Sequence, residues 1–264
     1  MQYQEYTERF LDHARVCEVH PFAHIIEGGK RYPLIAASTP GRKTLLITAG
    51  FHGNETAGPL TLMEYLPSIV EYARKRDVGL KIYPCLNPSG FEDLTRYNRS
   101  GEAPNNDFLR YELTPGVWAG ELEKGQTFVS TLPYRGGPKE TQALQTELAS
   151  LPAPDAALDI HQDPYLEEHL SYAYTFGDNA IFRPLVAATN RILPVARRFE
   201  VDDNVFSDDD GLIQLHDGSV TDYFFHRGVP LTAALETTTS SPLSACHEVD
   251  LVWIRGFVDL LAGT

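Results

Sequence analysis

The chain has 264 residues, 42% of them hydrophobic, with glycines and prolines spread along its length. This composition predicts one globular domain with a sizeable core over residues 1–264. Acidic residues outnumber basic ones by 36 to 22, so the formal charge is −14, and no basic cluster is dense enough to follow a phosphate backbone. Nucleic acid and anionic membranes are therefore not expected partners.

The amino-terminal stretch does not have the pattern of an export signal. It is acidic and amphipathic, without a cationic flank and an apolar centre, and no apolar run in the sequence approaches membrane-spanning length. We therefore expect a cytoplasmic protein. The cysteines, Cys17, Cys85 and Cys246, are odd in number and far apart, which favours buried thiols over disulfides or a CxxC metal site.

The first predicted strand spans residues 43–50, where KTLLITAG is apolar on both faces. Apolar residues at helical spacing predict a helix over residues 55–76, interrupted at Pro67. A second strand over residues 79–87 ends in the turn signal NPSG. Strand, helix and strand form a βαβ unit, which indicates a parallel or mixed sheet.

The next segment, residues 91–137, is rich in Gly, Pro, Asn and Thr and predicts a long loop region. After it the pattern predicts a helix (138–151), two strands (155–162 and 170–176), a helix (179–193), an acidic loop (207–211), a short helix (219–228), a strand (229–237) and a closing helix (242–261). This alternation predicts an α/β fold, a three-layer α/β/α sandwich with a mixed, mostly parallel central sheet.

Four polar residues stand at the ends of predicted strands. His52 and Glu55 follow the first strand, His161 ends the strand over residues 155–162, and Glu236 ends the strand over residues 229–237. Strand ends are where α/β sheets bind ligands, and two histidines with one glutamate suit a catalytic zinc ion that keeps a position for water. Glu236 would take the proton of that water and pass it to a leaving amine.

Each of these residues also has an ordinary structural interpretation. The HxxE spacing of His52 and Glu55 occurs often by chance, His161 alone fits a hydrogen-bonded core histidine, and Glu236 fits a rim carboxylate. Their joint placement at strand ends favours the site.

Four motifs follow one another between about residues 32 and 240: AGFHGNE, LNPSGFE, LDIHQD and GSVTDYFFHRGVPLTAALET. In these motifs the sequence resembles the zinc carboxypeptidase family, the carboxypeptidase A-like enzymes that include succinylglutamate desuccinylase and aspartoacylase. The resemblance implies a zinc carboxypeptidase-like fold and hydrolysis of an amide bond. It also implies one Zn²⁺ ion bound by His52, Glu55 and His161, with Glu236 as general base and acid.

The sequence departs from the family at the residues that hold a substrate's terminal carboxylate. Family carboxypeptidases use an Asn-Arg pair, whereas residues 105–108 read NNDF, so Asn105 keeps the amide and Asn106 replaces the arginine. A neutral amide does not reproduce a bidentate guanidinium. Ala103 stands where the family has an aspartate that orients the first ligand histidine, and Glu102 is the nearest substitute.

Further residues match the family's substrate-binding positions. Arg96 and Arg99 lie near the expected place of the arginine that stabilises the oxyanion, and Arg96 is preferred. The region of the family's mobile tyrosine reads LIQLHDGS, which leaves His216 as the nearest polar candidate. Thr221 and Asp222 match positions that line the pocket for the substrate side chain.

An alternative cation for that pocket would come from Arg110 or Arg135, and the sequence does not select between them.

Three functions are compatible with these residues. The first is a zinc metallopeptidase of carboxypeptidase type that acts on a small peptide or peptide-like amide. The second is an N-acyl amino acid amidohydrolase similar to the desuccinylase and aspartoacylase enzymes. Those enzymes usually carry a further β-rich domain, and the end of this chain at Thr264, directly after the predicted closing helix, favours the peptidase. The third is a zinc-binding module without catalysis. Substrate side chain and oligomeric state are not readable from the sequence.

Overall fold

A mixed sheet of eight strands forms the centre of the computed structural model, which describes residues 1–123 and 125–263. Residues 124 and 264, included in the predicted domain, lie outside this description. In spatial order the strands are β1 (Glu18–Glu27), β2 (Lys30–Thr39), β4 (Val78–Tyr83), β3 (Lys43–Ala49), β8 (Ala156–Asp163), β13 (Leu231–Thr238), β9 (Ser171–Thr175) and β12 (Leu212–Ile213). Four of the seven neighbouring pairs are parallel, so the prediction of a mixed, mostly parallel sheet is confirmed.

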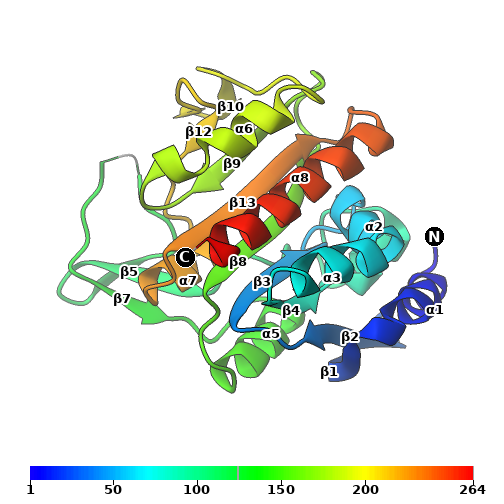
Figure 1. Cartoon of the computed structure of the whole chain (residues 1–264). Helices are drawn as coiled ribbons and strands as arrows, with labels where there is room; N and C mark the ends of the chain where they lie inside the picture. Colours follow the sequence, from blue (N-terminus) through cyan, green and yellow to red (C-terminus); the bar gives the residue numbers. More distant parts are fainter. Residues whose placement is uncertain (124, 264) are drawn as a thin grey trace.

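Helices cover both faces of this sheet and complete the predicted three layers (Figure 1). The core on one face includes side chains of α1 (Tyr3–His13), α2 (Ala57–Glu64), α3 (Leu66–Arg74), α6 (Arg183–Thr189) and α8 (Leu243–Ala262). The core on the other face includes side chains of α5 (Lys139–Ala149) and α7 (Val220–His226). Short helical segments at Ala14–Val16 and Asn179–Ile181 connect these elements.

The central strand β3 shows why its sequence is apolar on both sides. Leu45 and Ile47 point into the core beneath α2, α3 and α8, while Leu46 points into the core beneath α5 and α7. Alternation along a strand sends neighbouring side chains to opposite faces, and here both faces are covered. The predicted helix over residues 55–76 divides into α2 and α3, and Pro67 lies in the first turn of α3, where its missing N–H costs no hydrogen bond.

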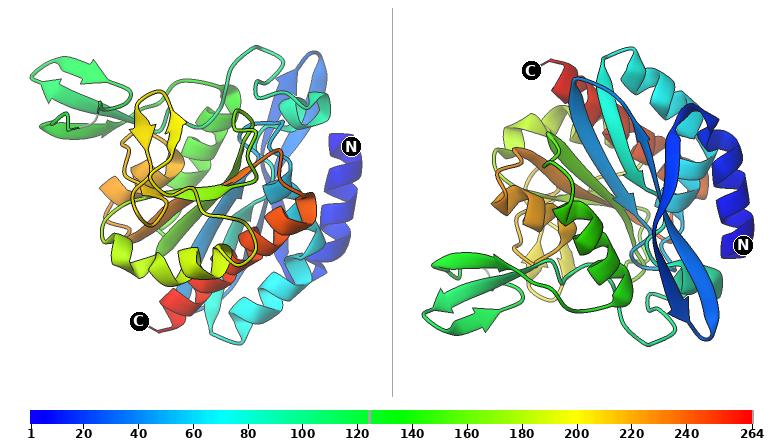
Figure 2. Two further views of the ribbon diagram at one scale, coloured as in Figure 1. Left: turned by 90° about the horizontal axis from the view of Figure 1, so that it is seen from above. Right: turned by 90° about the horizontal axis from the view of Figure 1, so that it is seen from below.

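Two segments differ from their predictions. The NPSG turn opens a short helix, α4 (Pro88–Asp93), whose first turn is capped by the side chain of Asn87. The predicted long loop contains a second sheet of three strands, β5 (Leu109–Thr114), β6 (Val117–Ala119) and β7 (Ser130–Pro133), which projects from the body of the molecule (Figure 2). Its strands are short and separated by glycine-containing turns, so the composition of the segment concealed them.

The amino-terminal hairpin of β1 and β2 was also not predicted. Its strands join at Gly28 and Gly29, both with positive φ, and β1 is an edge strand with only two buried residues of ten and therefore has no long apolar run. A further small hairpin pairs β10 (Glu200–Asp202) with β11 (Val205–Phe206).

All three cysteines are free, and Cys85 and Cys246 are buried as expected, but Cys17 is only partly buried. Across residues 1–123 and 125–263, no helix combines the length and the apolar character needed to cross a membrane.

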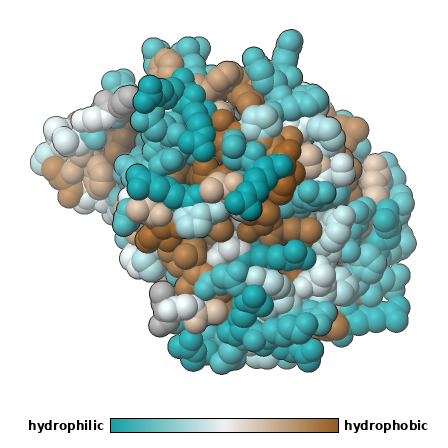
Figure 3. Space-filling view, turned by 45° about the horizontal axis from the view of Figure 1, so that its top comes forward, coloured by the Kyte–Doolittle hydropathy of each residue, from teal (hydrophilic) through white to brown (hydrophobic). Residues whose placement is uncertain are grey.

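Hydrophilic side chains dominate the rim of the face shown in Figure 3, while hydrophobic ones gather near its centre.

Candidate metal centre and active-site cavity

The carboxyl ends of three neighbouring parallel strands carry the polar residues that the sequence places at strand ends. β3, β8 and β13 lie in the order β3-β8-β13 within the sheet. His52 and Glu55 follow β3, His161 lies near the end of β8, and Glu236 is the register partner of His161 on β13. The topology of the sheet therefore brings these four residues to one edge.

The turn that follows β3 depends on two glycines. Gly50 has a φ of +67°, a conformation that side chains other than glycine adopt at a cost. A Cβ on Gly53 would lie 1.9 Å from the carbonyl carbon of Gly90 in α4. Close contact with α4 thus fixes the backbone that carries His52 and Glu55.

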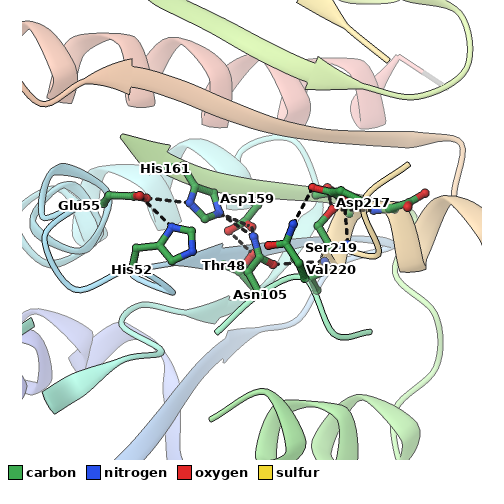
Figure 4. Close-up of polar contacts among 12 residues, drawn as sticks. Thr48, His52, Glu55, Asn105, Asp159, His161, Asp217, Ser219 and Val220 are labelled. Carbon is green, nitrogen blue, oxygen red and sulfur yellow. Dashed lines mark hydrogen bonds and ion pairs between the residues drawn. The ribbon is translucent and has the colours of Figure 1, made fainter. Parts of the chain in front are cut away.

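His52, Glu55 and His161 form a buried cluster with the chemistry of a metal site. They are 5%, 3% and 4% exposed, respectively. Oε1 of Glu55 lies 2.8 Å from Nδ1 of His52, and Oε2 of Glu55 lies 2.8 Å from Nδ1 of His161. One donor atom from each residue lies within 4.8 Å of the other two, and the three side chains point toward one another (Figure 4). Two imidazoles and one carboxylate fit a divalent metal with a position left for water.

Asp159 orients His161 from the side opposite the cluster. Its Oδ2 lies 2.7 Å from Nε2 of His161, and its Oδ1 accepts a hydrogen bond from the hydroxyl of Thr48 at 2.8 Å. Burial lowers the pKa of His161, but Asp159 at Nε2 and Glu55 at Nδ1 outweigh burial and raise it well above its usual value. A metal bound in the cluster would take the place of the proton on Nδ1, while Asp159 keeps the proton on Nε2. Sequence reasoning missed Asp159, although residues two apart on a strand share a face and LDIH shows this spacing.

Asn105 connects the cluster to α7. Because Nε2 of His161 carries the proton, the Asn105 amide donates to Oδ2 of Asp159, at 3.4 Å, rather than to the imidazole. Its carbonyl oxygen accepts from the backbone N–H of Val220 at 3.4 Å. These bonds hold Asn105 at a φ of +130°, a strained conformation outside glycine, as is common at functional sites.

The charges of the cluster favour an ionised Glu55. Burial disfavours its carboxylate, but His52 and His161 outweigh burial and hold the pKa of Glu55 below its usual value. Arg96 donates to Oε1 of Glu55 at 3.2 Å, and the backbone N–H of Gln162 donates to Oε2 at 3.2 Å. Burial lowers the pKa of His52 despite Glu55, which favours the neutral imidazole that metal binding needs.

Glu236 has a carboxylate oxygen without a hydrogen-bond partner. Its side chain is half-buried, and its Oε2 makes no hydrogen bond within the part of the chain that the structure describes. Burial raises the pKa of Glu236 well above its usual value; His161 opposes this shift, and Glu55 and Asp163 add to it. A carboxyl group that binds a proton readily and keeps one oxygen unpaired is suited to proton transfer.

A cavity of about 230 Å³ lies over the cluster. Its lining includes seven of the residues predicted from the sequence: His52, Glu55, Arg96, Asn105, Asn106, His161 and Glu236. Four other predicted residues, Arg99, His216, Thr221 and Asp222, are not in this lining.

Arg99 and Thr221 are engaged elsewhere. The guanidinium of Arg99 bonds to Asp93 of α4 through Nε at 2.7 Å and to the hydroxyl of Tyr32 at 2.8 Å. Thr221 is buried, and its hydroxyl lies 3.2 Å from that of Ser219. Ser219 lines the cavity in its place. Of the two candidate arginines, the structure thus brings only Arg96 to the cavity.

His216 and Asp222 belong to a second cluster, together with His226. Oδ1 of the fully buried Asp222 lies 2.8 Å from Nδ1 of His216 and 3.3 Å from Nε2 of His226. The hydroxyl of Tyr111 donates to the other oxygen of Asp222, which ties α7 to β5. Asp222 therefore points into the core beneath α7 instead of the cavity. Its contact with Tyr111 joins distant segments of the chain, and motif matching does not reveal such a contact.

Within the described residues, the cavity lining contains no second arginine that could replace the one missing at position 106. Among the described residues, Arg96 is the only Lys or Arg of the lining. Asn106 donates through its side chain to Asp217 at 3.2 Å.

The other basic residues considered for this role lie elsewhere. Arg110 pairs with Asp107 at 2.7 Å and is outside the cavity lining, and Arg135 lines a separate hollow beside α5. Glu102, the suggested substitute for an aspartate beside the first ligand histidine, instead accepts from Asn98 at 3.2 Å. The orienting aspartate of the site, Asp159 of β8, contacts His161 and not His52.

One wall of the cavity was not predicted at all. Tyr172 and Tyr174 of β9, and Phe176 just after it, lie on the same face of that strand and line the cavity. Their alternation in SYAYTF indicates a shared face and could have revealed them. The acidic residues that also line the cavity and were not predicted are Glu121, Asp163, Asp202 and Asp217.

The fold of the chain is that of carboxypeptidase-like proteins. It is similar to a candidate metallopeptidase from Shewanella baltica OS155, with a TM-score of 0.74, 23% identity, and coverage of 98% of this chain and 91% of that one. It is also similar to a candidate carboxypeptidase from Burkholderia mallei ATCC 23344 (0.66, 14%, 99% and 68%). A metallo-carboxypeptidase from Pseudomonas aeruginosa, in complex with (2-guanidinoethylmercapto)succinic acid, shares the fold as well (0.63, 14%, 98% and 68%).

A sequence model of the succinylglutamate desuccinylase/aspartoacylase catalytic domain matches residues 41–191. The chain belongs to this family, which confirms the resemblance found in the sequence and defines a hydrolase of the carboxypeptidase and desuccinylase/aspartoacylase kind. The matched segment contains His52, Glu55 and His161 and ends before Glu236. No curated protein matches the chain.

Proposed function

We propose that this protein is a zinc-dependent hydrolase that cleaves an amide bond in a small peptide or peptide-like compound, with Glu236 as general base and acid. One observation carries the proposal: the buried cluster of His52, Glu55 and His161 shares its cavity with the unpaired carboxylate oxygen of Glu236. Two histidines and one glutamate are the donor set of several catalytic zinc sites. A bound Zn²⁺ ion would lower the pKa of water and polarise the scissile carbonyl.

The residues around the cluster have complementary roles in this proposal. Glu236 takes a proton from the attacking water on its free oxygen and delivers it to the leaving amine. Arg96 donates hydrogen bonds to the oxyanion that develops on the carbonyl oxygen. Asp159 holds the proton of His161 on Nε2 and so keeps Nδ1 available for the metal.

The test separates metal binding from turnover. Glu236→Gln should keep about one zinc ion per chain, measured by elemental analysis, and should lose amine release from every substrate that the wild type cleaves. His161→Ala should lose the bound zinc. Activity that survives in Glu236→Gln would contradict the role of Glu236, and an unchanged zinc content in His161→Ala would remove His161 from the ligand set. A protein that binds zinc but cleaves no amide would be a binding module.

A second candidate is deacylation of an N-acyl amino acid, and the family match over residues 41–191 favours it. Both reactions break an amide bond and use the same groups, so the cluster does not separate them. A panel of dipeptides and N-acyl amino acids, assayed by amine release with the wild-type zinc protein, compares the two directly. Faster cleavage of the dipeptides supports the peptidase, and faster cleavage of the acyl compounds supports the deacylase.

A further inference from the structure

The cavity has a large excess of negative charge. Six carboxylates line it, and Arg96 is the only Lys or Arg among the described lining residues, which also include the two histidines of the metal cluster. A divalent metal and Arg96 together offset three of these charges, so about three remain when all six are ionised. The carboxylates are Glu55, Glu121, Asp163, Asp202, Asp217 and Glu236.

Two of these carboxylates are held by neutral donors rather than by cations. Asp163 accepts the hydroxyl of Tyr172 at 2.7 Å and the backbone N–H of Tyr165 at 2.7 Å. Asp217 accepts the backbone N–H of Ser219 at 2.9 Å and the side-chain amide of Asn106. Neutral donors fix the position of a carboxylate without supplying a positive charge, so a ligand cation placed between these groups can pair with both.

Aromatic rings complete the same wall. Tyr172 and Tyr174 lie with ring centroids 5.9 Å apart at 70°, and Phe176 follows them along the same face. Burial raises the pKa of Tyr174, and four carboxylates raise it further, which places this ring in the field of all four: Glu236, Asp217, Asp202 and Asp163. Aromatic faces beside carboxylates form a favourable environment for an organic cation.

We propose that this wall is a subsite for a cationic group of the substrate, an ammonium or a guanidinium. The inference rests on the proposed function and specifies it: the amide that is cleaved carries a basic side chain or amine. The Asp217 and Asp163 carboxylates pair with the cation, the Asp202 carboxylate adds its negative charge to the same lining, and the rings of Tyr172 and Tyr174 contact the cation. An anionic group at the same place would meet uncompensated carboxylates, since Asn106 supplies no positive charge.

Binding of small probes tests the subsite without turnover. We would titrate n-butylguanidinium, n-pentylammonium and the neutral n-butylurea into zinc-loaded and metal-free wild-type protein by isothermal calorimetry. The cations should bind at least about tenfold more tightly than n-butylurea, and Asp217→Asn and Asp202→Asn should each lower that preference several-fold. Asp12→Asn, which removes the same charge from an exposed side chain of α1, is the matched control and should leave the preference unchanged.

The outcomes are distinct from those of the hydrolysis test. Equal binding of n-butylurea, an unchanged preference in both cavity variants, or no cation binding at 10 mM would each overturn the subsite, whatever the hydrolytic activity. A preference for either cation that a folded cavity variant weakens supports it and identifies the head group. Thermal unfolding followed by circular dichroism shows whether each variant is folded, and Asp202→Asn, at an exposed position of β10, keeps the test valid if Asp217→Asn is not.

Discussion

Replacement of Asp159 tests how the site holds its histidine ligand. Asp159 is fully buried and bonds to Nε2 of His161 at 2.7 Å and to the hydroxyl of Thr48 at 2.8 Å. Asp159→Asn keeps the size and one acceptor but removes the charge, whereas Asp159→Ala removes the acceptor as well. Because loss of such a partner lowers metal affinity by about 10- to 100-fold, we expect about tenfold for the Asn variant and about 100-fold for the Ala variant.

The affinities are measured by competition for Zn²⁺ with a chromophoric chelator at one pH. Asp155→Asn is the control, because Asp155 is an exposed residue just before the opposite end of β8, and its side chain accepts from the backbone N–H of Thr44. Its affinity for zinc should equal that of the wild type. If Asp159→Ala bound zinc as tightly as the wild type while His161→Ala lost it, the orientation of His161 would not depend on Asp159, and the argument from the 2.7 Å contact would be refuted.

Two further predictions concern stability and turnover. Burial raises the pKa of Asp250 from 3.8 to about 7, so its contribution to stability is present below pH 4 and is lost as the pH rises to 7. Between pH 5 and 8 the wild type should lose about 3 kcal/mol of unfolding free energy through this group, and Asp250→Asn should not. The free energies are measured by urea unfolding, and the same pH dependence in both proteins would contradict this prediction. Arg96→Gln should lower kcat by about 10²- to 10³-fold without changing zinc content, whereas an unchanged kcat would exclude Arg96 from oxyanion stabilisation.

The metal cluster could be predicted because its signals are local. Three apolar segments end in polar residues: one in HGNE, one in LDIHQ and one in Glu236. Each pattern predicts a buried strand with a polar end. Parallel neighbours in one sheet then bring these ends together, so topology follows from the same pattern. The same local signal fails for β1, because an edge strand needs no apolar run.

The residues that sequence reasoning misplaced depend on contacts between distant segments. Asp222 matches a pocket position by its motif, yet Tyr111 of β5 and His216 draw its carboxylate into the core. The partner Tyr111 lies in the segment predicted as a loop, so nothing in the motif around Asp222 could indicate it. Spacing predicts which face of an element a residue occupies, but it does not predict which distant side chain that face meets.

The residue at position 106 relates two features of the cavity, the absent arginine for a substrate carboxylate and the acidic residues of the lining. Asn106 contacts Asp217 at 3.2 Å, so an arginine at this position would lie within reach of that carboxylate and would neutralise it. With asparagine, position 106 supplies no guanidinium for an anion, and the Asp217 carboxylate meets a neutral amide there instead of a cation. Loss of anion recognition and gain of cation recognition are therefore two consequences of one residue, which is why the charge of the substrate, more than its length, is expected to decide what this hydrolase cleaves.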